Sequence, residues 1–386
     1  MFRASLVFAL VASLSTPAAA SFDWLGKIDA AADDLKDRDP KARATAVREL
    51  ARYAIHWTRP YLLKALHDPD AAVRVAAGRV LASHGVAEAA PRVASWLTDA
   101  DVNVRTAAAE ILGQLEAKAA VPALIRSLGD PEADVRIRAV AALGQIGAPE
   151  SAIPIIGRLE DEKTGVRLAA VKALAKLGDS RAVVQLVGTF NDPSLEIRQQ
   201  AIMTVGKLGD AAAVPALLRL LRDRTVRSAA ATALGRLGSR SAVAPLIDAL
   251  SAERSDNSYR AVVATALGRI AKKAKKGTAA TAAVTALVEA LAEQHLRKAC
   301  REALAIAGRP AVPALVLHLR GQLGGDPETA VELLRDIRDP RSTEALIEEL
   351  GRRRLDRSLV LEALSRTGDD KALIPIIALL LSLIHI

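Results

Sequence analysis

The stretch VPALIRSLGDPEADVRIRAVAALGQIG, residues 121–147, contains two helical patterns that are separated by a proline turn. Pro122 lies in the first turn of the first pattern, where its missing N–H group costs nothing. Pro131 disfavours helical geometry at Asp130 and therefore ends this helix. The apolar face of the first helix is formed by Leu124, Ile125 and Leu128. The second pattern has apolar residues at helical spacing, namely Val135, Ala139, Ala142, Leu143 and Ile146, and Gly147 suits a left-handed C-terminal cap. The stretch predicts a pair of helices.

This unit recurs with a period of 31 residues. Seven aspartates keep the period: Asp37, Asp68, Asp99, Asp130, Asp161, Asp192 and Asp223. Six arginines follow them at a distance of six residues: Arg43, Arg74, Arg105, Arg136, Arg167 and Arg198. A leucine that closes the second helix marks about eleven units over residues 37–371, with Val205 replacing it once. Because no segment alternates with period two, we expect no sheet. The chain is predicted to be an all-α, right-handed α-solenoid of two-helix repeats.

The repeat resembles the HEAT repeat, in the short bacterial form of the phycobilisome lyases. The resemblance rests on a proline in the first helix (helix A), an aspartate eight residues later, and a Val-Arg pair at the start of the second helix (helix B). Pro122, Asp130 and Val135-Arg136 show this pattern, and the proline–aspartate spacing recurs in Pro60/Asp68, Pro91/Asp99 and Pro215/Asp223. Pro154 and Asp161 are one residue short of it.

The resemblance implies that the row of helices B lines a concave surface. It also implies that the aspartates and arginines bond along the stack as a structural ladder rather than in catalysis. The expected ladder residues are Asp68, Arg74, Asp99, Arg105, Asp130, Arg136, Asp161, Arg167, Asp192 and Arg198.

The repeats are regular over residues 37–250 and irregular over residues 251–371. Arg227, Arg260 and Arg297 lie 29, 33 and 37 residues after their predecessors. Loop insertions are therefore expected at 251–258, 271–281 and 320–327. Residues 21–36 are expected to form an N-terminal cap, and residues 372–386 an unpaired helix A with a truncated or artefactual tail.

The first 20 residues have the features of a signal peptide. Arg3 precedes an apolar stretch, residues 4–14, that is too short for a membrane anchor. Ala18-Ala19-Ala20 then offers small residues in an A-x-A arrangement, which predicts cleavage after Ala20. An amphipathic N-terminal helix is the alternative. The protein is thus expected in the periplasm or outside the cell, without a membrane span after cleavage.

The sequence lacks a cysteine metal cage and the histidine–glutamate pairs of a HEAT-repeat hydroxylase. Cys300 is the single cysteine, which excludes an intrachain disulfide and a cysteine metal cage, and we expect it to be buried on a helix B. Deoxyhypusine hydroxylase, a HEAT-repeat enzyme, holds two irons through His-Glu pairs. None of the six histidines here precedes a glutamate. We therefore expect no catalytic residues, no metal and no cofactor, and a bilin lyase-like or hydroxylase-like enzyme remains the alternative.

Two groups of residues are candidate binding surfaces. The first is a basic column, two residues beyond the closing aliphatic position, followed by a lysine cluster. The column consists of Lys176, Lys207, Arg236 and Arg269, and the cluster of Lys272, Lys273, Lys275 and Lys276. Residues 257–288 around the cluster contain no acid. Cations at helix C-termini also stabilise the helix dipole, which is the alternative explanation.

The second group is aromatic and lies in the first quarter of the chain: Trp24, Tyr53, His56, Trp57, Tyr61 and Trp96. It predicts either a cap over the first repeat or an anchoring patch for a peptide or glycan.

These observations predict a non-catalytic, exported scaffold that binds a protein or polyanionic partner along its helix B surface. A nucleic acid is the less favoured partner, because only 3% of the residues are aromatic and the protein is expected to be exported.

Overall fold

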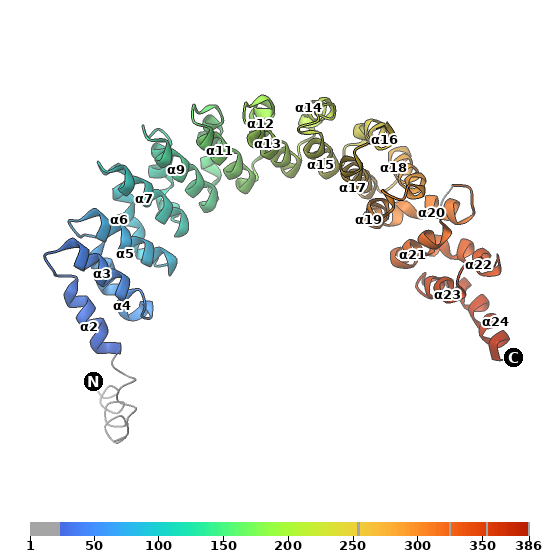
Figure 1. Cartoon of the computed structure of the whole chain (residues 1–386), viewed down its shortest axis with the longest axis horizontal. Helices are drawn as coiled ribbons and strands as arrows, with labels where there is room; N and C mark the ends of the chain where they lie inside the picture. Colours follow the sequence, from blue (N-terminus) through green and yellow to red (C-terminus); the bar gives the residue numbers. More distant parts are fainter. Residues whose placement is uncertain (1–23, 253–254, 324–325, 353, 385–386) are drawn as a thin grey trace, which may run out of the picture. The chain divides into compact units, whose positions relative to one another are not determined.

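The computed structural model describes residues 24–252, 255–323, 326–352 and 354–384. These residues form α-helices joined by turns and short 3-10 helices, and they contain no β-strand (Figure 1). The predicted all-α solenoid class is confirmed. The predicted signal peptide, residues 1–20, lies outside the described residues.

The chain divides into two compact units, residues 1–177 and 178–386. Each is built from consecutive pairs of a helix A and a helix B. The pairs of unit 1 are α2 (Trp24–Asp34) with α3 (Pro40–Leu50), α4 (Ile55–Ala65) with α5 (Ala71–Ser83), α6 (Ala90–Ser95) with α7 (Val102–Gln114), α8 (Val121–Ser127) with α9 (Ala133–Ile146), and α10 (Ala152–Ile156) with α11 (Thr164–Leu177).

Unit 2 continues the same alternation. Its pairs are α12 (Val183–Gly188) with α13 (Leu195–Leu208), α14 (Val214–Leu220) with α15 (Arg227–Leu237), α16 (Val243–Ala252) with α17 (Asn257–Ala274), α18 (Thr278–Glu289) with α19 (Arg297–Ala307), α20 (Val312–Leu319) with α21 (Pro327–Ile337), and α22 (Thr343–Arg352) with α23 (Arg357–Ser365). Helix α24 (Leu373–Ile384) follows, with Leu373, Ile374, Ile377 and Leu381 more than half exposed.

Short 3-10 helices begin most helices A and extend several of them. They are Ala87–Ala89, Trp96–Thr98, Lys118–Ala120, Pro149–Ser151, Gly157–Glu160, Ser180–Ala182, Thr189–Asn191, Ala211–Ala213, Arg240–Ala242, Ala290–Ala292, Arg309–Ala311, Pro340–Ser342 and Asp370–Ala372.

The sequence that predicted a helix pair forms α8 and α9. Pro122 occupies the first turn of α8, and α9 ends at Gly147, whose φ of 70° is left-handed. The loop expected at 271–281 is shorter than predicted, because α17 continues to Ala274. Alanine and lysine have high helix propensity, so these inserted residues lengthen the helix instead.

Helices B of neighbouring repeats approach closely at a glycine that follows the closing aliphatic residue. A Cβ atom on Gly144 of α9 would lie 2.8 Å from the Cβ of Ala173 in α11. On Gly206 or Gly235 it would lie 2.7 Å from the Cα of the facing alanine, Ala233 or Ala266. Gly113 with Ala142, and Gly268 with Ala303, repeat the contact. No side chain fits between these backbones, so the glycine–alanine pair sets the spacing of the stack.

Replacing Gly144 by alanine therefore tests the packing. Alanine is the better helix former by about 1 kcal/mol, yet the added methyl group must push α9 and α11 apart. We expect a net loss of about 1–3 kcal/mol, as for other overpacked cores, and a lower thermal midpoint by circular dichroism.

The matched control is Gly157→Ala, because a Cβ there meets no atom within 4 Å and the backbone is right-handed. This variant should be as stable as the wild type or slightly more stable. Equal midpoints for the two variants would show that the contact does not limit the spacing.

Candidate functional site

In unit 1 the ladder joins neighbouring repeats through single arginines. The Nε and Nη2 atoms of Arg136 each donate to a different oxygen of Asp161, both at 2.9 Å. Its Nη1 atom donates to the carbonyl oxygens of Asp130 and Pro131 at 2.9 and 3.0 Å. Arg136 thus holds the turn of its own repeat and the aspartate of the following repeat at once.

Unit 1 repeats this bridge. The other ion pairs are Arg43–Asp68 at 2.7 Å, Arg74–Asp99 at 3.1 Å and Arg105–Asp130 at 2.8 Å. The carboxylate partner of Asp130 is therefore Arg105 of the preceding repeat, whereas Arg136 contacts only the backbone oxygen of Asp130. In unit 1, Arg167 donates to the carbonyl of Asp161, and in unit 2, Arg198 donates to that of Asp192.

Two ladder acids of unit 2 were missed by the sequence pattern. Arg227 pairs with Asp256 and Arg260 pairs with Glu293, each at 2.7 Å. Both acids stand four residues before the next arginine rather than six, because the connection between the two helices changes length there. An acid at either offset before the arginine is the signal that would have found them.

The pKa values of the ladder residues Asp130 and Asp161 are lowered. Burial alone would raise the pKa of Asp161, but the hydrogen bond from Arg136 and the N–H group of Lys163 outweigh it and lower that pKa. The same balance lowers the pKa of Asp130, through Arg105 and the N–H group of Glu132. These carboxylates are tied into structure and are poorly suited to proton transfer near neutral pH.

In unit 2 the basic column lies beside the glycine contacts. Lys207, Arg236 and Arg269 directly follow Gly206, Gly235 and Gly268 on the adjacent helices α13, α15 and α17. Lys207 and Arg236 are exposed, and Arg269 is half-buried. Gly206 faces Ala233, two residues before Gly235, so successive contacts shift by about 3 Å along the helix axis. The three cations therefore follow one another across neighbouring helices. In unit 1, Lys176 is exposed near the end of α11.

The lysine cluster has two distinct parts. Lys272, Lys275 and Lys276 are exposed and line a groove of about 820 Å³ at the ends of α17 and α19. Lys273 instead donates to the carbonyl of Arg236, and a Cβ on Gly238 would meet its alkyl chain. Lys273 is exposed like the other three lysines, but its ammonium group also binds the C-terminal end of α15.

The aromatic group separates into a surface part and a core residue. The rings of Trp24 and Trp57 lie 5.4 Å apart, and His56 lies 4.9 Å from Trp57, which is 48% exposed. Tyr53 donates to Glu49 at 3.4 Å. Trp96 does not belong to an exposed patch, since it is 3% exposed and lies against Gly78 in the core.

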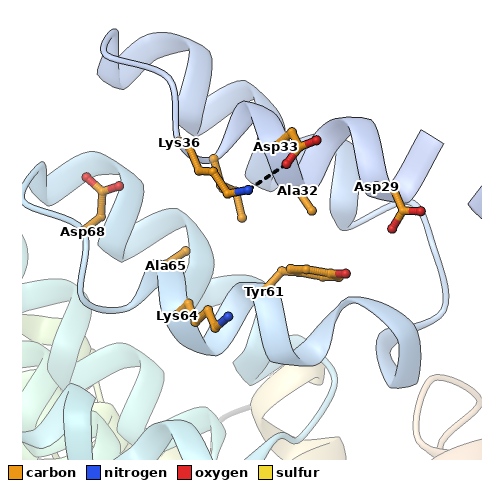
Figure 2. A pocket seen from close by; sticks show the side chains of 9 residues that line it. Asp29, Ala32, Asp33, Lys36, Tyr61, Lys64, Ala65 and Asp68 are labelled. Carbon is orange, nitrogen blue, oxygen red and sulfur yellow. Dashed lines mark hydrogen bonds and ion pairs between the residues drawn. The ribbon is translucent and has the colours of Figure 1, made fainter. Parts of the chain in front are cut away.

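Tyr61 lines a hollow of about 440 Å³ between α2 and α4 (Figure 2). Asp29 and Asp33 approach it from α2, and Lys64 lies beside Tyr61 on α4. Lys36 pairs with Asp33 at 2.8 Å. The lining mixes both charge signs, so this hollow offers less discrimination between anions and cations than the lysine groove.

No group of three or more potential metal ligands occurs among the described residues. Cys300 is buried, as expected, and burial raises the pKa of its thiol to about 12, with a further contribution from the charge of Glu293. His318 is also buried, and its ring contacts the carbonyls of Leu323 and Asp326 in the turn before α21. His385 lies outside the described residues.

Comparison with known families decides the classification. The sequence pattern of HEAT repeats matches overlapping segments from residue 28 to residue 307: 28–106, 59–139, 90–166, 121–199, 154–226, 183–268 and 222–307. The chain belongs to the HEAT repeat family. No curated protein matches it in sequence.

Two solved structures illustrate what this HEAT protein is similar to. Importin beta, crystallised from polyethylene glycol, is 15% identical with a TM-score of 0.56, over 92% of this chain and 61% of importin beta. The CpcE–CpcF complex of phycocyanin lyase from Nostoc sp. PCC7120 is 22% identical with a TM-score of 0.37, over 59% of this chain and 92% of that chain. At these identities the similarity to importin beta concerns the fold alone.

In the described part of this HEAT protein, no single helix is long and apolar enough to cross a membrane. One pair, Arg297–Ala307 with Arg309–Leu319, reaches that length and hydropathy only when joined across a bend of 112°.

The ladder predicts unequal effects for two neighbouring arginines of α9. Arg136→Ala removes the bridge to Asp161 and leaves its buried carboxylate poorly paired, which should cost about 1–3 kcal/mol. Arg138 is exposed, so Arg138→Ala should change stability by about 0.5 kcal/mol or less. Thermal denaturation of both variants provides the comparison, and equal midpoints would refute the structural role of Arg136.

The lowered pKa of Asp130 and Asp161 also predicts sensitivity to acid. A depressed folded-state pKa stabilises the protein above the unfolded pKa of about 3.9 and loses that contribution as the pH falls through the folded value. The thermal midpoint of the wild type should therefore fall below about pH 4. The Asp161→Asn variant should have a lower thermal midpoint than the wild type at neutral pH. Its midpoint should then decrease less steeply as the pH falls. If the thermal midpoints of wild type and variant depended on pH in the same way, the Asp161 carboxylate would not be the source of the acid sensitivity.

Proposed function

We propose that this protein is a non-catalytic scaffold, exported to the periplasm or beyond, that binds a protein partner through acidic groups. The observation that carries the proposal is the alignment of Lys207, Arg236 and Arg269 on three adjacent helices B of unit 2. A repeating row of cations suits an extended acidic surface better than a small ligand.

The distribution of charge supports this assignment. Residues 178–386 contain 30 lysines and arginines against 23 aspartates and glutamates, a net charge of +7. Residues 1–177 contain 23 against 21, a net charge of +2. Much of this positive charge lies in residues 257–288, which span α17 and most of α18 and contain no acid. Such a surface attracts an acidic partner and accelerates its association at low salt.

The proposal of a binding rather than catalytic function rests on residue chemistry. The most regular polar side chains, the ladder pairs, are occupied in holding the repeats together. The single cysteine is buried and protonated near neutral pH. Histidine–glutamate pairs, which a hydroxylase of the HEAT type would use, do not occur in the sequence. Export is inferred from Arg3, the apolar segment 4–14 and the Ala18-Ala19-Ala20 site.

The test is a double charge reversal, Lys207→Glu with Arg236→Glu, in the full chain. Proteins crosslinked to the wild type in cells are captured and quantified after separation of periplasm and cytoplasm. A partner that depends on the basic column should be lost from this variant, while the thermal midpoint stays nearly unchanged.

Arg222→Glu with Arg224→Glu is the matched control, because these exposed arginines of the α14–α15 turn change the net charge by the same amount. It should retain the partner. If both variants captured the partner equally, the basic column would only stabilise the helix dipoles and would not bind the partner. Recovery of the protein from the cytoplasm alone would contradict export.

A further inference from the structure

The groove at the ends of α17 and α19 combines a basic rim with an apolar floor. Its volume is about 820 Å³, and it extends to the turn that follows α21. Lys272, Lys275 and Lys276 contribute from the end of α17, Arg309 from the turn after α19, and Arg341 from the turn after α21. Asp339 is the single acid of the lining.

This acid is already neutralised by its neighbours. Both oxygens of Asp339 accept from Arg341 at 2.8 Å, and its side chain is 5% exposed. Arg309 lies 3.7 Å from the same carboxylate with its own side chain 77% exposed. Lys272, Lys275 and Lys276 form no ion pair with any described residue. Three ammonium groups thus have no anionic partner among the described residues, and the side chain of Arg309 is largely exposed beside them.

The backbone directs two consecutive lysines into the groove. Lys275 has φ 58° and ψ −49°, and the N–H group of Lys276 donates to the carbonyl of Ala274 at 2.6 Å. This is a γ-turn with positive φ, a rare and strained conformation for a residue with a side chain. Both Lys275 and Lys276 line the groove as a result. Strained residues cluster at ligand-binding segments.

The floor between these cations is apolar. Ile306 and Pro310 are half-buried, Ala307 is buried, and Pro340 is exposed. A hydrated polymer with charges along its whole length gains nothing from these surfaces. A peptide with an aliphatic side chain between acidic residues would bury the aliphatic group and pair its carboxylates with the rim.

We propose that this groove binds a short acidic segment of a partner protein, with glutamate or aspartate side chains on the lysines and one aliphatic side chain against Ile306. The inference rests on the proposed scaffold function and names the part of the partner that is recognised. In this proposal the basic rim binds the acidic side chains, and the apolar floor selects a peptide over a polyanionic polymer.

Fluorescence anisotropy of the full chain with labelled peptides tests this site. The probes are a peptide with glutamates flanking a leucine, the same peptide with glycine in place of leucine, and heparin as a polyanion. Wild-type protein should bind the leucine peptide at least about ten-fold more tightly than the glycine peptide, because the leucine side chain removes apolar surface from water against Ile306.

The double variant Lys275→Glu with Lys276→Glu should lower the affinity for the leucine peptide at least about ten-fold at low salt, the equivalent of about 1.4 kcal/mol. Arg222→Glu with Arg224→Glu should leave its affinity unchanged. Ile306→Ser should remove the preference for leucine while retaining the weaker binding of the glycine peptide. The thermal midpoint of each variant shows whether the fold is intact.

Unchanged peptide affinity in the Lys275/Lys276 variant, or no binding by the wild type, would overturn the proposal. Heparin binding that exceeds peptide binding, with no effect of leucine, would also overturn it in favour of a polymer surface. If the Lys207/Arg236 variant loses its partner while the Lys275/Lys276 variant retains it, the scaffold function stands and only the groove assignment falls. If neither variant loses a partner, both fall.

Discussion

The close contact between a glycine of one helix B and an alanine of the next is the constraint on which the repeats depend. In α9 and α11, α13 and α15, and α15 and α17, the facing backbones leave no room for one additional methyl group. Dispersion forces favour such dense packing, and a Cβ at this point would separate the helices along their whole length. Successive contacts within a unit shift by about 3 Å along the helix axis, so these helices B are held in a defined register.

The aspartate–arginine bridges act at the other end of the same helices. Arg136 near the start of α9 contacts its own turn and Asp161 of the following repeat, so that one side chain satisfies backbone carbonyls and neutralises a buried carboxylate. Where the connections change length in unit 2, the bridge persists with Asp256 or Glu293 as the acceptor. The requirement is an anion in reach of the guanidinium, and its sequence offset is secondary. In α9, α15 and α17, apolar packing and paired charges thus stabilise opposite ends of the helix.

The candidate binding surface follows from this construction. In α13, α15 and α17 of unit 2 a cation directly follows the contact glycine, so that Lys207, Arg236 and Arg269 lie in a row on adjacent helices. Lys273 differs from its neighbours in one contact, because its ammonium group donates to the carbonyl of Arg236. The neighbouring Lys275 and Lys276 are presented to solvent by a strained turn over an apolar floor. The physical distinction is between cations that complete the fold and cations that the fold leaves without a counter-ion.

The sequence alone determined the repeat, the helix pairing and the family, because a 31-residue period with proline, aspartate and glycine at constant positions reports local backbone geometry. It also determined that the arginines and aspartates are structural, since catalysis does not require seven copies of one acid. Tertiary structure decided the pairing partners: Asp130 bonds Arg105 of the preceding repeat, which the spacing within a unit does not reveal. It decided as well that Trp96 is in the core, that residues 271–274 extend α17, and that Lys273 donates to the carbonyl of Arg236. The pairing partners and the burial of these side chains depend on contacts between different helices, which a local sequence pattern does not predict.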